Sequence, residues 1–438
     1  MKRRFTLAVT AAVLFAFVLC ACPPEDSGSE SSQQKQPPKK TIKKVYDGEL
    51  DYLGWFFLLW EIANQNDYID LDLSDCTLDP DNKKGGLCEE IIDDGSFTPP
   101  FPDPDPRKYI AFDPYPSFIN GKEKIVSITL PKEATMIIGT NIPDGKETPD
   151  NWAFRHFTNL RSVTGENVNL IGKYAFYNCK TLEKVDFPHV SHAVSNSELT
   201  DPNNDMINGF RVDIGHNAFE NCTALTDVSI PNATVIGRSA FKGCTNLKIL
   251  NFSHVWMIAQ NAFEGCTGLT EVEFGNVTKI GNEAFKNCTR LVSAAFPATR
   301  RNTPGDPPPL DGEIPNYASI IFYDRAFYGC KALKKLDVRN AWNVYFCIGA
   351  LANIGETLEL LLFDSTTALE AYGHPQLANC FGVDDPDNDN YPQTLETITL
   401  KVPIFINSPN IDEETPGNIA HFIKHYDPEI TVDIQRNL

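Results

Sequence analysis

The chain has 438 residues, of which 38 are Lys or Arg and 58 are Asp or Glu, so its formal net charge is −20. This charge argues against nucleic acid as the main partner, because phosphate backbones are bound by basic surfaces. Hydrophobic residues make up 42% of the chain, which excludes wholesale disorder and suffices for one large or two ordinary domains. The one long apolar run lies at the N-terminus, so we expect no membrane span in the mature chain.

The N-terminus has the layout of an export signal. Three basic residues precede the apolar stretch 5–18, which is too short for a comfortable bilayer span. The stretch ends in Leu-Cys-Ala-Cys at 19–22, which resembles a bacterial lipobox with Cys22 as the lipidated residue. Lipidation at Cys20 fits less well, and an ordinary cleaved signal is the remaining alternative. We expect a signal peptide over 1–21 and an anchor made of acyl chains on Cys22.

Residues 22–45 join this anchor to the rest of the chain. They are rich in Ser, Gln, Pro and Lys and cannot bury much apolar area. The composition predicts a flexible tether. The next segment, 46–120, precedes the repeats described below, and we interpret it as an N-terminal lead-in or cap.

An internal repeat dominates residues 121–400. The pattern is Ala-Phe-x-x-Cys-x-x-Leu-x-x-Val-x-Phe-Pro, and its first Phe recurs with separations of 22, 43, 22, 22, 22 and 42 residues. The two long separations equal one period plus an insertion, at 191–211 and 298–319. A fixed period of this length predicts a solenoid of leucine-rich-repeat type. The aligned positions are Phe154, Phe176, Phe219, Phe241, Phe263, Phe285 and Phe327, followed by Leu351.

Each repeat predicts one short strand and one turn. Leu-x-x-Val-x-Phe alternates apolar and polar residues, so about ten such strands should stack into a parallel sheet along one, concave face. Ala-Phe predicts a single helical turn on the convex side, with the Phe pointing inward. The residue before each Cys is always Asn or Gly, the types that most readily adopt positive φ, so a left-handed stop should end each turn. These residues are Asn178, Asn221, Gly243, Gly265, Asn287, Gly329 and Asn379.

The repeat resembles the BspA-like, or Treponema-pallidum-type, leucine-rich repeat. The clearest copies are 236–252 and 280–297, and the segment 68–74 is similar to the lead-in of spirochaetal members. The resemblance implies a bacterial surface protein that binds matrix proteins, other cells or other bacteria. We expect no cofactor and no catalysis, because the sequence has no Gly-x-Ser-x-Gly motif, phosphate loop or dinucleotide fingerprint. We expect residues 401–438 to form a C-terminal cap, because a solenoid end otherwise exposes its core.

The cysteines divide into two groups. Six share one repeat position and should behave as small buried hydrophobes with free thiols, since parallel side chains are poorly placed for a disulfide. Cys76 and Cys88 flank a turn-rich segment and form the best candidate disulfide, with free thiols equally open. The six repeat cysteines are Cys179, Cys222, Cys244, Cys266, Cys288 and Cys330.

Candidate partner-binding residues lie on the outer side of the predicted sheet and on its rim. Trp256 and Trp342 take repeat positions that are polar elsewhere, so both should be partly exposed and suited to anchor a partner, unless an inserted loop covers them. Arg300 and Arg301 lie in the second insertion, which is either a binding loop or a tolerated surface insertion. The outward strand positions are Lys184, Asp186, Asp227, Asn251, Glu271, Glu273, Lys335, Asp337 and Arg339.

Two weaker motifs suggest metals. The acidic residues at 385, 387, 389 and 396 have the spacing of a calcium loop, but Asn390 stands where Gly is expected, so a solvated turn is the favoured interpretation. His421 and His425 could share a helix face but have no obvious third ligand. The calcium candidates are Asp385, Asp387, Asp389 and Glu396.

The sequence therefore predicts a non-catalytic lipoprotein of the bacterial envelope. We expect it to be exposed on the outer membrane and to bind host matrix or cell-surface proteins through the concave sheet and rim loops. A periplasmic scaffold that binds other envelope proteins is the main alternative, and a metal-dependent sensor or enzyme is a distant third.

Overall fold

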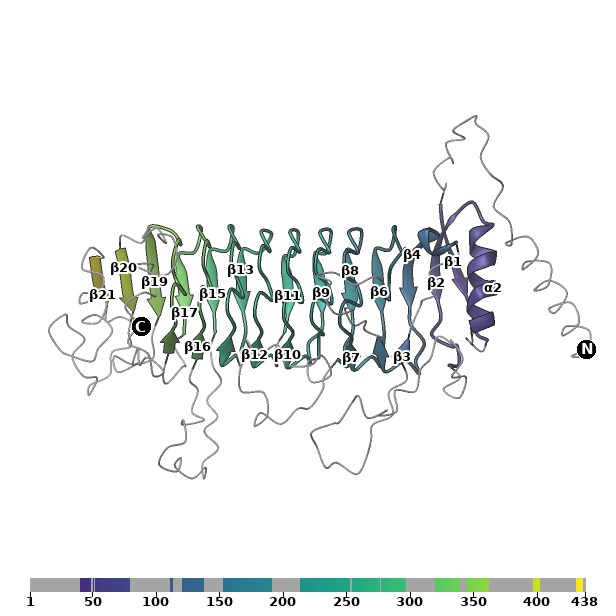
Figure 1. Ribbon diagram of the computed structural model, residues 1–438, viewed down its shortest axis with the longest axis horizontal. Coiled ribbons are helices and arrows are strands. Elements are labelled where there is room, and N and C mark those ends of the chain that lie inside the picture. Colours follow the sequence, from purple (N-terminus) through teal and green to yellow (C-terminus); the bar gives the residue numbers. More distant parts are fainter. Residues whose placement is uncertain are drawn as a thin grey trace, which may run out of the picture. The chain divides into compact units, whose positions relative to one another are not determined.

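The repeats form a solenoid of parallel strands (Figure 1). The computed structural model describes residues 40–48, 50, 52–78, 111–112, 120–137, 153–190, 213–252, 254–275, 277–296, 320–338, 344–361, 397–401 and 431–435. All of them belong to one compact unit, Lys39–Leu438. No helix among these residues is both long enough and apolar enough to cross a membrane.

The strands predicted from Leu-x-x-Val-x-Phe form what we call the main sheet. In the described residues its strands occur as a seven-stranded and a six-stranded parallel sheet, one after the other along the chain. The first holds β1 (Thr41–Val45), β2 (Tyr68–Asp72), β4 (Ile125–Thr129), β6 (Ser162–Thr164), β8 (Lys184–Asp186), β9 (Asp227–Ser229) and β11 (Ile249–Asn251). The second holds β13 (Glu271–Glu273), β15 (Ser293–Ala295), β17 (Lys335–Asp337), β19 (Thr357–Leu361), β20 (Thr397–Lys401) and β21 (Thr431–Gln435).

The main sheet extends beyond the predicted repeats at both ends. β1 and β2 precede the first predicted strand, and β21 follows the last. β1 lies inside the segment predicted as a flexible tether, yet it pairs in parallel with β2 along its whole length. Pairing with β2 explains this difference, because backbone hydrogen bonds to a neighbouring strand stabilise a strand as well as an apolar pattern does. The Lys residues at 43 and 44 are typical of an edge strand, where charge discourages further pairing.

A second, smaller sheet runs along the solenoid and was not predicted. Its strands are two or three residues long and occur between the main strand and the turn of each repeat (Figure 1). Ile214 bridges Ile171 and Ile236, which joins the two groups of strands. The strands are β3 (Ala111–Phe112), β5 (Met136–Ile137), β7 (Leu170–Ile171), β10 (Val235–Ile236), β12 (Met257–Ile258), β14 (Lys279–Ile280), β16 (Ile320–Phe322) and β18 (Val344–Phe346).

The Ala-Phe segment forms hydrogen-bonded turns, which we call the Ala-Phe turns, rather than a helical turn. The backbone is left-handed before each Cys, as predicted, with φ between 58 and 75° at the six described positions. It is left-handed a second time at the residue before each Ala, which was not predicted. Between these two points alternate backbone N–H groups bond to the next repeat, as from Phe219 to Ala240 at 2.7 Å. The second series comprises Tyr174, Asn217, Ser239, Asn261, Glu283, Arg325 and Gly349.

The core consists of rows of identical residues. The seven repeat Phe rings stack in one ladder, with neighbouring centroids 4.4–5.4 Å apart and planes within 15° of parallel. Each repeat cysteine is a free, buried thiol, as predicted. Its Sγ donates to the carbonyl of the Phe one repeat earlier, for example from Cys266 to Phe241 at 3.0 Å. Burial raises the pKa of Cys179 to about 12, so this thiol stays protonated.

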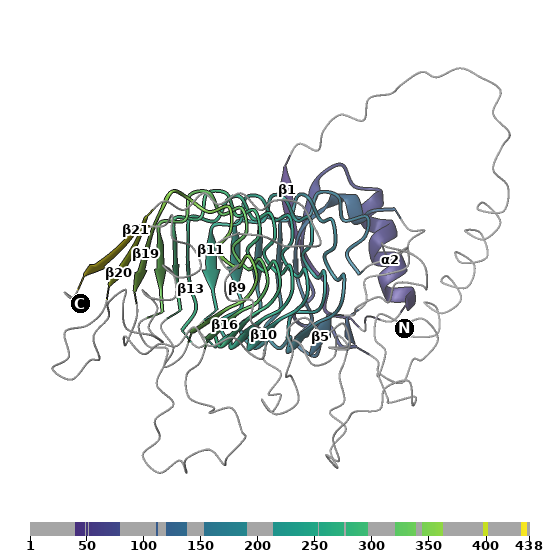
Figure 2. The same ribbon diagram turned by 60° about the vertical axis from the view of Figure 1, so that its left-hand side comes forward.

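Helix α2 (Tyr52–Ala63) closes the N-terminal end of this core (Figure 2). Trp55, Leu58, Leu59 and Ile62 are buried on its inner side and belong to the same hydrophobic cluster as the main sheet. The 3-10 helix η1 (Lys122–Lys124) follows Gly121, whose φ is 118°. A Cβ at Gly121 would lie 2.5 Å from the Leu59 carbonyl oxygen, so glycine permits this close approach.

Candidate protein-binding surface

The outer side of the main sheet presents two polar rows. The parallel register places Ser127, Ser162, Lys184 and Asp227 in one row, because each pairs with its neighbour in the next strand. The other row contains Thr129, Thr164, Asp186 and Ser229. Both rows lie opposite buried residues such as Val185 and Val228. The sheet thus holds a set of polar side chains at fixed spacing on a rigid base.

Some predicted binding residues pair with each other. Lys184 and Asp227 face one another across β8 and β9, with Nζ and Oδ2 3.4 Å apart and both side chains at least one-third exposed. Lys43 and Asp72 form a similar pair at 2.9 Å between β1 and β2. Hydrogen bonding to Lys43 lowers the pKa of Asp72 and keeps it ionised. The Lys184–Asp227 pair is exposed on both sides and contributes little stability, so its charges are available to a partner.

The middle of the solenoid carries the most exposed acidic pair of the rows. Glu271 and Glu273 both lie exposed on β13, as predicted. Their neighbours on β15, Ser293 and Ala295, are small and half-buried. A partner side chain can therefore approach the two carboxylates from the β15 side. The backbone of Asn251 lies at the equivalent position of β11, while Lys335 is half-buried on β17.

Asp337 departs from the prediction of an exposed outer position. Its backbone has the expected register, between Ala295 and Leu361. Its side chain is nevertheless buried, with 6% of the residue exposed. The alternation of a strand decides whether a side chain points toward the core or away from it. Whether an outward side chain is exposed depends on what other parts of the fold cover it. We therefore remove Asp337 from the accessible surface.

Trp256 lies at the rim of the main sheet, where the chain turns into β12. Its backbone N–H donates to the Thr234 carbonyl at 2.9 Å, and its carbonyl accepts from Thr278 N–H at 2.8 Å. The side chain is half-buried, as expected of a partly exposed anchor. Among the other predicted residues, Cys22, Trp342, Arg300, Arg301, Arg339, Cys88 and the calcium candidates Asp385, Asp387, Asp389 and Glu396 lie outside the described residues.

Cys76 is a buried free thiol whose Sγ donates to the Tyr46 carbonyl at 3.0 Å. Burial, reinforced by the charge of Asp47, raises its pKa to about 12. A disulfide with Cys88 would require this thiol to leave the Tyr46 carbonyl and stays a prediction. Within the described residues no group of three or more His, Cys, Asp or Glu side chains is placed to hold a metal ion.

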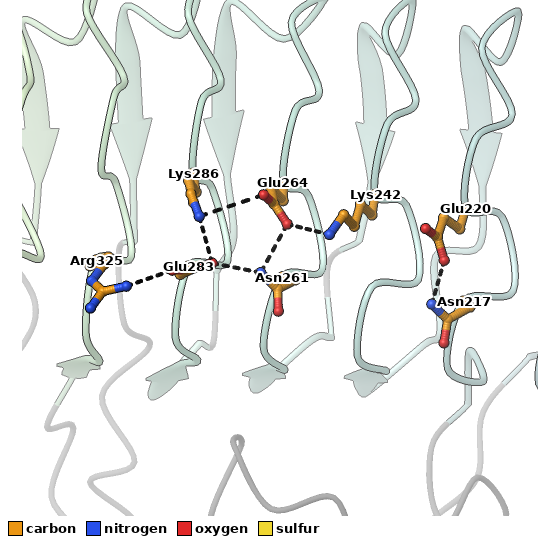
Figure 3. A network of polar contacts seen from close by, with 8 residues as sticks. All are labelled: Asn217, Glu220, Lys242, Asn261, Glu264, Glu283, Lys286 and Arg325. Carbon is orange, nitrogen blue, oxygen red and sulfur yellow. Dashed lines mark hydrogen bonds and ion pairs between the residues drawn. The ribbon is translucent and has the colours of Figure 1, made fainter. Parts of the chain in front are cut away.

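Sequence reasoning missed a polar network on the Ala-Phe turns (Figure 3). Lys242 pairs with Glu264 at 2.7 Å, and Lys286 pairs with Glu283 at 2.9 Å. Asn261 donates to both Glu264 and Glu283, at 2.9 and 3.1 Å, and so links neighbouring repeats. The signal was present as alternating charge at the residue after the repeat Phe, which is Glu220, Lys242, Glu264 and Lys286 in successive repeats.

Two acids on these turns have pKa values shifted in opposite directions. Burial raises the pKa of Glu220, against the hydrogen bond from Asn217. Burial also acts to raise the pKa of Glu283, but hydrogen bonds from Lys286, Asn261 and Arg325 outweigh it, and the pKa lies below its ordinary value. Glu264 and Glu283 form ion pairs with Lys242, Lys286 and Arg325, whereas Glu220 is bonded to the neutral Asn217. These contacts tie neighbouring repeats together.

Comparisons with known proteins identify the repeat. The family model described as the BspA type leucine-rich repeat region matches in six copies, over residues 121–201 and 211–304. None of the curated proteins compared with the chain matches it.

Similar solved structures include a leucine-rich cell surface protein from Faecalibacterium prausnitzii A2-165, which is 18% identical and has a TM-score of 0.29. The match covers 75% of this chain and 91% of that one. A leucine-rich repeat protein from Bacteroides ovatus is 14% identical, with 72% and 85% covered and a TM-score of 0.24. The pneumococcal vaccine antigen PcpA is 12% identical, with 75% and 83% covered and a TM-score of 0.23.

Proposed function

We propose, on the premise that six repeats match the BspA type leucine-rich repeat model over residues 121–201 and 211–304, that the chain is a lipid-anchored bacterial surface protein that binds other proteins without catalysis. The anchor is the acyl-modified Cys22, and the partner is a host matrix or cell-surface protein. Binding takes place on the outer rows of the main sheet and on the rim that holds Trp256.

The observation that carries this proposal is the contrast between the two sides of the main sheet. The inner side repeats the same apolar residues from strand to strand, as stacking requires. The outer rows change from Ser and Thr on β4 and β6 to charged residues on β8, β9 and β13. A rigid surface with varied polar groups and an aromatic side chain at its edge suits protein recognition.

Surface location is tested on intact producing cells. Protease added outside should remove the repeat domain while a periplasmic control protein survives. Cys22→Ala should abolish acyl labelling of the protein, since it removes the thiol that carries the acyl chains. A repeat domain that is protected until the outer membrane is broken would refute surface exposure and favour the periplasmic scaffold.

The binding surface is tested with charge reversals. We expect immobilised matrix proteins or host cells to retain the wild-type chain and to lose at least tenfold affinity for Glu271→Lys. The matched control is Glu356→Lys, which makes the same charge change at an exposed residue of the turn before β19. Equal binding by both variants would exclude the middle of the main sheet as the contact.

A further inference from the structure

Helix α2 is apolar on more than the side that it buries. Its sequence, YLGWFFLLWEIA, contains one charged residue, Glu61. The inner side is complete with Trp55, Leu58, Leu59 and Ile62, all at most 2% exposed. A helix that only caps a core would have a polar outer side. Here the outer side instead carries Phe56, Phe57 and Trp60.

Trp60 is the most exposed of the large hydrophobic side chains in the described part of the chain, with 60% of its surface accessible. Phe56 and Phe57 are half-buried beside it, and their rings meet edge to face at 5.6 Å. Holding a Trp side chain in water in this way opposes the hydrophobic effect. The outer side of α2 is therefore suited to contact a surface that is less polar than water.

The one charge on α2 is neutralised locally. Lys44 of β1 contacts Glu61 with Nζ and Oε1 2.6 Å apart. The C-terminal end of the helix is also satisfied, because Lys124 Nζ donates to the Ala63 carbonyl at 2.7 Å and Asn64 Nδ2 donates to the Trp60 carbonyl at 2.8 Å. If α2 approaches a less polar surface, its one charged residue therefore arrives there already paired.

The chain connection indicates which surface this is. The described fold begins at Lys40, and β1 is the strand that Lys44 joins to α2. Only the segment 23–39 separates this point from Cys22. A flexible segment of this length reaches on the order of 25 Å. If Cys22 is anchored, α2 is held within reach of the bilayer, whose interfacial region favours Trp side chains.

We propose that the outer side of α2, centred on Trp60, rests on the lipid interface of the membrane that carries the anchor. This inference rests on the proposed lipid anchor. The contact would give the solenoid a defined attachment at its N-terminal end, in addition to the acyl chains. The rim and the main sheet would then extend away from the attached end toward partners.

The test separates the contact from the native anchor. The mature chain from Pro23 onward receives an N-terminal hexahistidine tag and is tethered to phosphatidylcholine vesicles that contain a nickel-chelating lipid. Brominated phosphatidylcholine quenches tryptophans that enter the interface. Trp60 is one of five tryptophans, so we expect brominated vesicles to remove up to one-fifth of the emission.

Trp60→Phe should abolish this quenching, whereas the matched variant Trp256→Phe should retain it. Quenching that is absent, or equal in Trp60→Phe and wild type, overturns the proposal. A dimer in solution that Trp60→Glu converts to a monomer also overturns it, because a second copy would then cover the helix. Failure of the native anchor is read separately, from acyl labelling of wild type against Cys22→Ala.

Discussion

The Phe ladder predicts a specific cost for removing one ring. Phe263 is fully buried and stacks on Phe241 and Phe285, with centroids 5.4 and 5.2 Å away. Leu351 takes the same repeat position and is also fully buried, so the fold accommodates Leu there. Phe263→Leu therefore removes mainly two ring stacks, each contributing about 0.5–1.5 kcal/mol. We expect a loss of about 1–3 kcal/mol, and about 3–5 kcal/mol for Phe263→Ala.

Urea unfolding followed by circular dichroism measures this loss. Because each repeat contacts only its neighbours, Phe263→Ala should also separate the transition into two steps. The control is Val292→Ala at a 41% exposed residue, which should change stability by less than about 0.5 kcal/mol. A Phe263→Leu variant as stable as that control would refute the claim that ring stacking holds the repeats together.

Three further predictions concern the core and the turns. The six repeat cysteines should resist iodoacetamide at pH 8 in the folded protein and become labelled in urea, as mass spectrometry would show; labelling in the native state would contradict their burial. Glu283→Gln should cost about 1 kcal/mol at pH 7. Because the pKa of Glu283 is lowered, its contribution is full above the ordinary value of 4.5 and is lost as pH falls through the folded pKa, so unfolding curves of variant and wild type should converge in acid. Gly265, with φ 72° and no atom closer than 4.0 Å to an added Cβ, should accept Asn within about 0.5 kcal/mol but not Val, as thermal melts would reveal.

The inner rows of the solenoid were predictable from sequence because stacking requires the same residue type at every repeat. The Phe ladder, the cysteine row and the left-handed Asn or Gly positions all follow from this requirement. The second left-handed series was not predictable in this way. It contains Tyr174, Ser239 and Arg325, whose residue types give no signal for positive φ. Inter-repeat hydrogen bonds, rather than local preference, hold these residues in that conformation.

Short or unpatterned elements account for most of the remaining differences. Strands of two residues, such as β10 and β12, show no alternation that a sequence pattern could detect. β1 reads TIKKV and continues a polar, Lys-rich segment, so its pairing with β2 had no apolar signal. On the candidate surface, register was predicted correctly for Glu271 and Asp337, but exposure only for the first.

The inner rows, the turns and the outer rows of the solenoid therefore tolerate substitution to different extents. An inner position packs on its own copy in the next repeat, so one substitution disturbs two interfaces. An outer position such as Glu271 contacts small neighbours and can change at little cost to stability. The turn network is intermediate, because Glu283 pairs with Lys286 of its own repeat and with Arg325 of the next. The residues of the outer rows and the rim can therefore change to bind different partners while the inner ladders stay the same. For this reason the fold can be predicted from this sequence, whereas the partner depends on the chemistry of the surface residues.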